Sequence, residues 1–322
     1  MYYFFLLGAA ITSFKKQNFF LGYMSDILVI GTVALDTIQT PFGRVDRALG
    51  GSATYASFAA SFFAKPAVIS VIGHDFPEEY RELLKKRGID LDGLQVSDKT
   101  FHWEGFYEYD MNEAKTKKTE LNSLAGFKIN VPEKHRDAKY LFLGNIDPDL
   151  QLEALRQIKN PEFVVLDTMN FWISGKKEPL LKAISRANVL LLNDGEARQL
   201  FDTASLVKAA NDALKLGPEA VIIKKGEHGA LLFTKNRHFS APSYPLENIK
   251  DPTGCGDSFG GGFIGYLAKT GNLNESNFRK AIIYGSVLAS YNAEDFSLNR
   301  LKSITMNDIE KRYAEFKDIR EF

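Results

Sequence analysis

Short runs of apolar, β-branched residues alternate along this chain with segments of helical periodicity. Most runs are continuously apolar, as strands buried on both faces must be. They lie at 27–31, 67–73, 140–144, 163–167, 188–193, 220–226 and 230–234. The helical segments lie at 51–64, 77–87, 149–158, 178–186, 194–202, 205–216, 257–270 and 275–293. This alternation predicts a mostly parallel sheet covered by helices on both faces, with ligands bound beyond the carboxyl ends of its strands.

Two segments interrupt the alternation, residues 32–49 and 100–124. The first carries no helix signal. In the second, apolar and polar residues alternate, which predicts one strand face made of Phe101, Trp103, Tyr107, Tyr109 and Met111. A turn near 111–113 would close a hairpin. A strand pair outside a parallel sheet predicts a small lid, whose exposed aromatic face needs the substrate or a second subunit as its partner.

The composition excludes several classes of protein. Lys+Arg and Asp+Glu both count 40, so no basic excess indicates nucleic acid or an anionic membrane as partner. The single cysteine, Cys255, excludes a disulfide framework and favours a reducing cytoplasm. None of the five histidines falls at metal-ligand spacing, so zinc has no support.

Residues 1–23 precede the first predicted strand. Their apolar run, 2–11, is too short to span a bilayer, and its lysines follow it instead of preceding it as in a secretory signal. We interpret residues 1–23 as an upstream extension or a misplaced start, with a weak membrane or partner anchor as the alternative. Residues 24–322 then form the folded domain.

The stretch IKDPTGCGDSFGGGF, residues 249–263, places glycines at and after a predicted helix start. Each glycine inside a helix costs about 1 kcal/mol relative to alanine. At the helix N-terminus, however, Gly254, Cys255 and Gly256 would present unpaired amides and the positive end of the macrodipole to an anion. Asp257 could accept a proton there from an attacking hydroxyl. The alternative is a glycine-rich turn and a tightly packed helix without chemistry.

The letters DPTGCGD resemble the D-[TP]-x-G-[AC]-G-D motif of the ribokinase-like, or pfkB-type, carbohydrate kinases. The resemblance implies that Asp257 is the catalytic base. It also implies that the amides of Gly254, Cys255 and Gly256 form an anion hole for the transferring phosphoryl group. For Cys255 we expect only the amide to matter, the alternative being an oxidisable thiol of lowered pKa.

Three further motifs resemble the substrate side of that family. Gly50 and Gly51 match its N-terminal di-glycine at a helix start. Asp36 matches the aspartate that binds substrate hydroxyls, and Asn170 in LDTMN matches the end of its D-x-N strand. The resemblance implies that these four residues contact the substrate.

Other motifs resemble the nucleotide side. NDGEA matches the N-x-x-E motif, which implies that Asn193 and Glu196 hold Mg²⁺, mainly through water, beside the phosphates. KKGEHG resembles the T-x-G-x-x-G nucleotide loop, with Gly226 and Gly229 retained and Lys224 where threonine is usual.

The family's last long helix walls the adenine. By the same resemblance we expect Asn292 on this helix, with Asp251 and Thr253 of the glycine-rich motif, to contact the nucleotide. The glycine that the family usually has after this helix is replaced here by NAEDFSL, which argues against a monovalent-cation site.

Together, and in the order that the family has them, these motifs imply a ribokinase-like three-layer α/β/α fold with a mostly parallel central sheet and a small β-sheet lid. They imply an enzyme that uses ATP and Mg²⁺ to phosphorylate a hydroxyl of a sugar or a sugar-containing small molecule. A homodimer through the lid is also expected. A nucleoside or hydroxymethylpyrimidine kinase of the same fold, and a non-catalytic sugar- or nucleotide-binding regulator, remain the alternatives.

Overall fold

A sheet of nine strands forms the centre of the computed structural model, which describes residues 25–321. The interpretation of residues 1–23 lies outside this range. Seven neighbouring strands run parallel and two antiparallel strands extend one edge. The mostly parallel sheet is thereby confirmed. Its order is β13 (His238–Ala241), β12 (Ala230–Thr234), β11 (Ala220–Lys224), β10 (Val189–Asn193), β9 (Phe163–Leu166), β8 (Tyr140–Leu143), β1 (Ile27–Ile30), β4 (Pro66–Gly73) and β5 (Asp90–Ser97).

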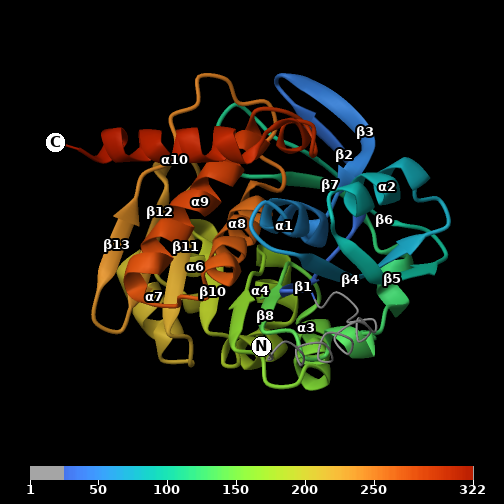
Figure 1. Ribbon diagram of the computed structural model, residues 1–322, viewed down its shortest axis with the longest axis horizontal. Helices are drawn as coiled ribbons and strands as arrows, with labels where there is room; N and C mark the ends of the chain where they lie inside the picture. Colours follow the sequence, from blue (N-terminus) through green and yellow to red (C-terminus); the bar gives the residue numbers. More distant parts are fainter. Residues whose placement is uncertain (1–24, 322) are drawn as a thin grey trace, which may run out of the picture.

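Helices cover both faces of this sheet, which makes the three layers (Figure 1). One hydrophobic cluster joins the sheet to α1 (Ser52–Ala60), α2 (Glu78–Lys86), α8 (Cys255–Thr270), α9 (Glu275–Ala293) and α10 (Met306–Arg320). A second cluster on the other face joins it to α3 (Pro148–Gln157), α4 (Asn170–Gly175), α5 (Lys177–Ile184), α6 (Asp194–Phe201) and α7 (Leu206–Leu214). No helix between residues 25 and 321 is long and apolar enough to cross a membrane.

Four of these elements were not predicted from the sequence: β5, β13, α4 and α10. Strand β5 is an edge strand with a single buried residue, so it lacks a continuous apolar run. Helix α10 fully buries only Ile309 and Phe316, and most of its other residues are polar or charged. Four short 3₁₀ segments lie in the connections, at Asn122–Gly126, Glu133–His135, Gly226–His228 and Leu301–Ser303.

The two segments that interrupt the alternation meet in a second, four-stranded sheet, at the upper right of Figure 1. Its order is β3 (Gly43–Gly50), β2 (Ala34–Thr40), β6 (Phe101–Phe106) and β7 (Lys115–Glu120). The predicted hairpin is present, because β6 and β7 pair antiparallel around the loop 107–114. The predicted aromatic face is wrong beyond Phe106, where the strand ends: Met111 is buried, whereas Tyr109 is exposed.

The glycines of α8 let this helix touch its neighbours through backbone atoms. A Cβ added to Gly261 would overlap the carbonyl oxygen of Ala56 on α1. One added to Gly262 would lie 3.1 Å from the Cα of Gly285 on α9, and one on Gly260 would lie 2.6 Å from the Phe142 ring. Side chains therefore cannot separate α8 from α1, α9 and the sheet, and the position of its N-terminus is fixed.

We predict that Gly261→Ala lowers the free energy of unfolding by about 1–3 kcal/mol, because neither backbone can move away from the added methyl group. Urea denaturation of the purified protein measures the change. The matched control is Gly175→Ala, since a Cβ at Gly175 meets nothing within 4 Å. We expect this control to change stability by less than about 0.5 kcal/mol. Equal stability of the two variants would contradict the packing argument.

Candidate active site

Polar side chains gather where β9, β10 and β11 end. Asp167 follows β9 directly, Asn193 ends β10, and Lys224 ends β11. These strands are parallel neighbours, so their carboxyl ends lie at one edge of the sheet. The N-x-x-E motif and the nucleotide-loop motif are therefore adjacent in space, because Asn193 pairs with Lys224 in neighbouring strands.

The N-terminus of α8 adjoins this edge. Gly254 caps the helix in the left-handed region, at φ 77°, and a Cβ there would overlap the ring of Tyr55. A Cβ on Gly256 would lie 3.0 Å from Lys224 Nζ, so the ammonium adjoins the predicted anion hole. Asp257 lies in the first turn of the same helix. Base, amides and lysine thus occupy one region.

A buried ion pair links the ends of β9 and β11. Lys224 Nζ donates to Asp167 Oδ2 at 2.6 Å, with side chains 17% and 4% exposed. We assigned no role to Asp167 from the sequence. The available signal was an aspartate immediately after the fully buried strand FVVL. Its partner is 57 positions away, which no local pattern could indicate.

Burial raises the pKa of two carboxyl groups in this cluster to about 7. For Asp257, burial is the largest cause, the charge of Asp167 adds to it, and Lys224 opposes it. For Glu196, burial again leads, with Lys224 opposing and Asp167 adding. Three carboxylates facing one ammonium leave an excess of negative charge, which a divalent cation can offset.

Asn193 and Glu196 hold each other in a capping box at the start of α6. Asn193 Oδ1 accepts from the Glu196 amide and Glu196 Oε2 accepts from the Asn193 amide, both at 2.7 Å. In residues 25–321 no group of three or more His, Cys, Asp or Glu side chains is arranged to hold a metal. The acidic cluster still fits Mg²⁺, because that ion keeps several waters and takes few protein ligands.

Asp36 lies on β2 against the two glycines that precede α1. Its Oδ2 occupies the space that a Cβ on Gly50 would fill, and the backbones of Gly51 and Trp103 both act to lower the pKa of the carboxyl group. Its Oδ1 is buried and has no hydrogen-bond partner among the described residues. Burial and the charge of Asp251 raise the pKa of Asp36 to about 8. A buried acceptor without a partner is available to a hydroxyl group of a ligand.

The loop 107–114 of the second sheet contacts both sides of the site. The Thr253 hydroxyl donates to Tyr107 Oη at 3.2 Å. A Cβ on Gly226, which has φ 54°, would overlap Asn112 Oδ1. The second sheet is thus joined to the glycine-rich motif and to the nucleotide loop. Gly229 also has positive φ, at 81°, and its position against Ala241 leaves no room for a side chain.

Asp251 is fully buried, and its Oδ1 accepts from the Thr253 amide at 2.9 Å. This bond shapes the turn that leads into α8. Burial raises the pKa of Asp251 to about 6, with the hydroxyl and amide of Thr253 opposing. Both residues, expected at the nucleotide, lie in the loop that carries the anion hole.

One predicted position needs correction, and the expectations for two others stand. Asn292 is fully buried and donates to the carbonyl oxygen of Thr253 at 2.7 Å, so it braces the glycine-rich turn instead of facing a nucleotide. Burial raises the pKa of the Cys255 thiol to about 12, which agrees with the expectation that only its amide matters and argues against an oxidisable thiol of lowered pKa. Asn170 is exposed at the start of α4, and its contact with the substrate stays a prediction.

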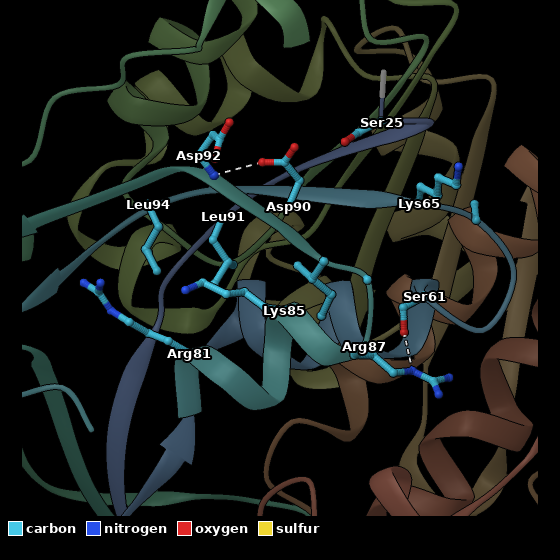
Figure 2. Close-up of a pocket in the computed structure, with 13 residues that line it drawn as sticks. Ser25, Ser61, Lys65, Arg81, Lys85, Arg87, Asp90, Leu91, Asp92 and Leu94 are labelled. Carbon is cyan, nitrogen blue, oxygen red and sulfur yellow. Dashed lines mark hydrogen bonds between the residues drawn. The ribbon is translucent and has the colours of Figure 1, made fainter. Parts of the chain in front are cut away.

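A pocket of about 730 Å³ lies elsewhere, between α2, β5 and the end of α1 (Figure 2). Its cationic side chains point in different directions, and Arg81 and Lys85 are among those that form ion pairs. Arg81 and Lys85 lie 3.8 and 3.9 Å from Glu78. The pocket contains none of the motif residues and carries no chemistry for this site.

The raised pKa of Asp36 has a consequence for stability. Its carboxyl group binds a proton more tightly in the folded protein than in the unfolded chain. The contribution of this proton to the free energy of unfolding is therefore complete below about pH 4 and is lost as the pH rises through about 8. We predict that the free energy of unfolding of the ligand-free protein falls between about pH 4 and 8. Asp36→Asn should flatten this fall by up to about 1.4 kcal/mol per pH unit.

Urea denaturation across this pH range tests the prediction. Asp318→Asn, on the exposed face of α10, is the control and should leave the slope unchanged. Stability that rises with pH in the wild-type protein, or an Asp36→Asn variant with the wild-type slope, would contradict it.

Comparison with known proteins agrees with this geometry. The pfkB family carbohydrate kinase profile matches residues 15–302. A cytidine kinase from Thermococcus kodakarensis is 32% identical over 257 residues, which cover 78% of this chain and 92% of the relative.

Two solved structures share the fold. A nucleoside kinase from Burkholderia thailandensis in complex with inosine superposes with a TM-score of 0.73 at 19% identity, over 92% of this chain and 100% of the other. A putative ribokinase II from E. coli in complex with ATP and Mg²⁺ superposes with a TM-score of 0.73 at 17% identity, over 90% and 99%. The ribokinase-like fold is thereby confirmed. The chain belongs to the pfkB family of carbohydrate kinases and is an ATP-dependent phosphotransferase acting on a sugar or a sugar-containing small molecule.

Proposed function

We propose that this protein is an ATP-dependent nucleoside kinase, which transfers the γ-phosphoryl group of ATP to a hydroxyl of the sugar. The observation that carries the proposal is the position of Asp257. It lies in the first turn of α8, beside the amides of a glycine-rich turn and near the Lys224 ammonium. Such a place suits a base that serves phosphoryl transfer.

In this proposal Asp36 accepts a hydrogen bond from a sugar hydroxyl through its unpartnered Oδ1, and the Gly50–Gly51 turn leaves room for the sugar. Asp257 takes the proton of the attacking hydroxyl. The amides of Gly254 to Gly256 stabilise the charge on the phosphoryl oxygens. Positioning and electrostatics then supply most of the rate, as in other phosphoryl transfers.

The nucleotide lies on the other side of the phosphoryl group. Gly226 and Gly229 let the nucleotide loop turn closely around the phosphates, and Asn193 with Glu196 holds Mg²⁺ through water. When bound, Mg²⁺ offsets phosphate charge. The acidic residues already present supply the complementary field that attracts the ion.

The preference for a nucleoside over a free sugar rests on the second sheet and on the relatives. Phe101, Trp103 and Tyr107 are half-buried on β6 and the loop that follows, where an aromatic ring can stack on a base. The cytidine kinase relative and the inosine-bound structure are the comparisons that favour this substrate class. We propose that this sheet is the lid of a single kinase domain, residues 24–322, with lid segments 32–49 and 100–124.

The proposal includes a homodimer through the lid and a cytoplasmic location. Phe42 and Tyr109 are 55% and 84% exposed, and their rings lie edge to face at 6.5 Å. This exposed aromatic pair supports the dimer, because apolar surface of this kind favours a partner. The location is supported by the single cysteine, which can form no disulfide within the chain.

We predict that Asp257→Asn lowers kcat by at least about 10²-fold, because the amide cannot accept the proton. Binding of ATP should survive. ADP release with Mg-ATP measures turnover against a panel of nucleosides, pentoses, hexoses, sugar phosphates and hydroxymethylpyrimidine. Asp318→Asn is the matched control and should retain wild-type turnover.

The panel separates the candidate functions. Turnover with nucleosides that disappears in Asp257→Asn supports the proposal. Turnover only with a free sugar or with hydroxymethylpyrimidine would refute the nucleoside as substrate and identify that other compound as the substrate class. Silence with intact ATP binding identifies a regulator, and near-wild-type activity of Asp257→Asn refutes its role as base.

We predict that turnover does not depend on a monovalent cation. The loop after α9, where the family usually has a glycine, holds the Lys250 ammonium 2.7 Å from Asp295 Oδ1. Rates in K⁺, Na⁺ and tetramethylammonium buffers of equal ionic strength should agree within about two-fold. A selective rise in rate with K⁺ would contradict this prediction.

A further inference from the structure

Asp167 holds Lys224 in one position. The two oxygens of the carboxylate have separate partners, since Oδ1 accepts from the Thr168 amide at 2.9 Å and Oδ2 accepts from Lys224 Nζ at 2.6 Å. The Asp167 side chain is 4% exposed and cannot turn away into water. A long, flexible lysine is thereby fixed at the carboxyl ends of the strands.

The fixed ammonium faces the reacting region. Its nitrogen lies 3.0 Å from the position of a Cβ on Gly256, the residue before the proposed base. Its charge also acts on both Asp257 and Glu196. Lys224 is therefore close enough to act on both the proposed proton acceptor and the residue proposed to hold Mg²⁺ through water.

Two of the three ammonium hydrogens remain for a ligand. A lysine ammonium has three donors, and the one hydrogen bond of Lys224 Nζ within residues 25–321 is the bond to Asp167. A purely structural role explains the location poorly, because buried ion pairs are often replaceable by apolar pairs without loss of stability. The remaining donors at the mouth of the anion hole indicate an anionic ligand.

We propose that Lys224 is a further catalytic residue, which donates to the oxygens of the transferring phosphoryl group, and that Asp167 is the positioning residue that holds it there. The inference rests on the proposed kinase function. The hydroxyl oxygen bonds to the γ-phosphorus, the bond to the bridging oxygen of ADP breaks, and the proton goes to Asp257. Lys224 keeps its three protons throughout and offsets charge.

The test compares Asp167→Asn, Lys224→Met and the double variant with the wild type, using the best nucleoside of the panel. Lys224→Met should lower kcat by about 10²–10³-fold, the scale of losing one preorganised donor. The KM for ATP should change less than about three-fold, because the donor acts mainly in the transition state. Asp167→Asn should lower kcat at least about ten-fold.

The double variant shows whether Asp167 acts through Lys224. We expect its kcat to equal that of Lys224→Met. If Asp167 acts only by positioning Lys224, its loss has no further effect once the lysine has been removed. Lys224→Arg keeps the charge and should retain more activity than Lys224→Met. Lys176→Met removes a comparable ion pair, with Asp147 at 2.7 Å, and should leave kcat unchanged.

The outcomes separate the inference from the proposed function. Wild-type turnover that Asp257→Asn abolishes, but that Asp167→Asn and Lys224→Met leave intact, overturns the inference alone. Losses that multiply in the double variant overturn the positioning role. If a single variant fails to fold around the remaining buried charge, the neutral double variant decides: wild-type kcat there refutes the inference. Absence of wild-type turnover refutes the kinase proposal itself.

Discussion

The direct contact of α8 with α1, through Gly261 and the Ala56 backbone, is the constraint on which the site depends. The N-terminus of α8 carries both Asp257 and the amides of the proposed anion hole. A methyl group on the inner faces of the helix would displace that end from the strands where Asp167 and Lys224 lie. Glycines weaken an isolated helix because their helix propensity is low. Here they allow close packing against the neighbouring helices, which fixes the position of α8 and offsets that loss of stability.

The second constraint is electrostatic. Burial raises the pKa of Asp36, Asp251, Asp257 and Glu196, so ionised carboxylates in this region cost folding free energy in the ligand-free protein. Lys224 is the cation that opposes the pKa shifts of Asp257 and Glu196 at the strand ends. Such a site is stable when a ligand supplies further positive charge, and it illustrates how function is obtained at the expense of stability.

The four-stranded sheet links the two halves of this arrangement. Its β2 strand carries Asp36, whereas its loop 107–114 reaches Thr253 and Gly226 through Tyr107 and Asn112. The second sheet therefore contacts both the proposed substrate side of the site, through Asp36, and the proposed nucleotide side, through the loop 107–114. In the proposed function this lets the sheet exclude water while it positions the acceptor, which strengthens every electrostatic interaction inside.

The sequence by itself determined the parallel sheet, the layers, the hairpin of the second sheet and the order of the motifs, because hydrophobic periodicity and glycine placement are local properties. It missed β5 and α10, whose exposed residues give weak periodicity. Only the tertiary structure decided which distant groups meet. The Lys224–Asp167 pair, the brace from Asn292 and the raised pKa of Cys255 all depend on burial and on neighbours far away in the chain. Packing sets these distances, and packing involves the whole chain at once.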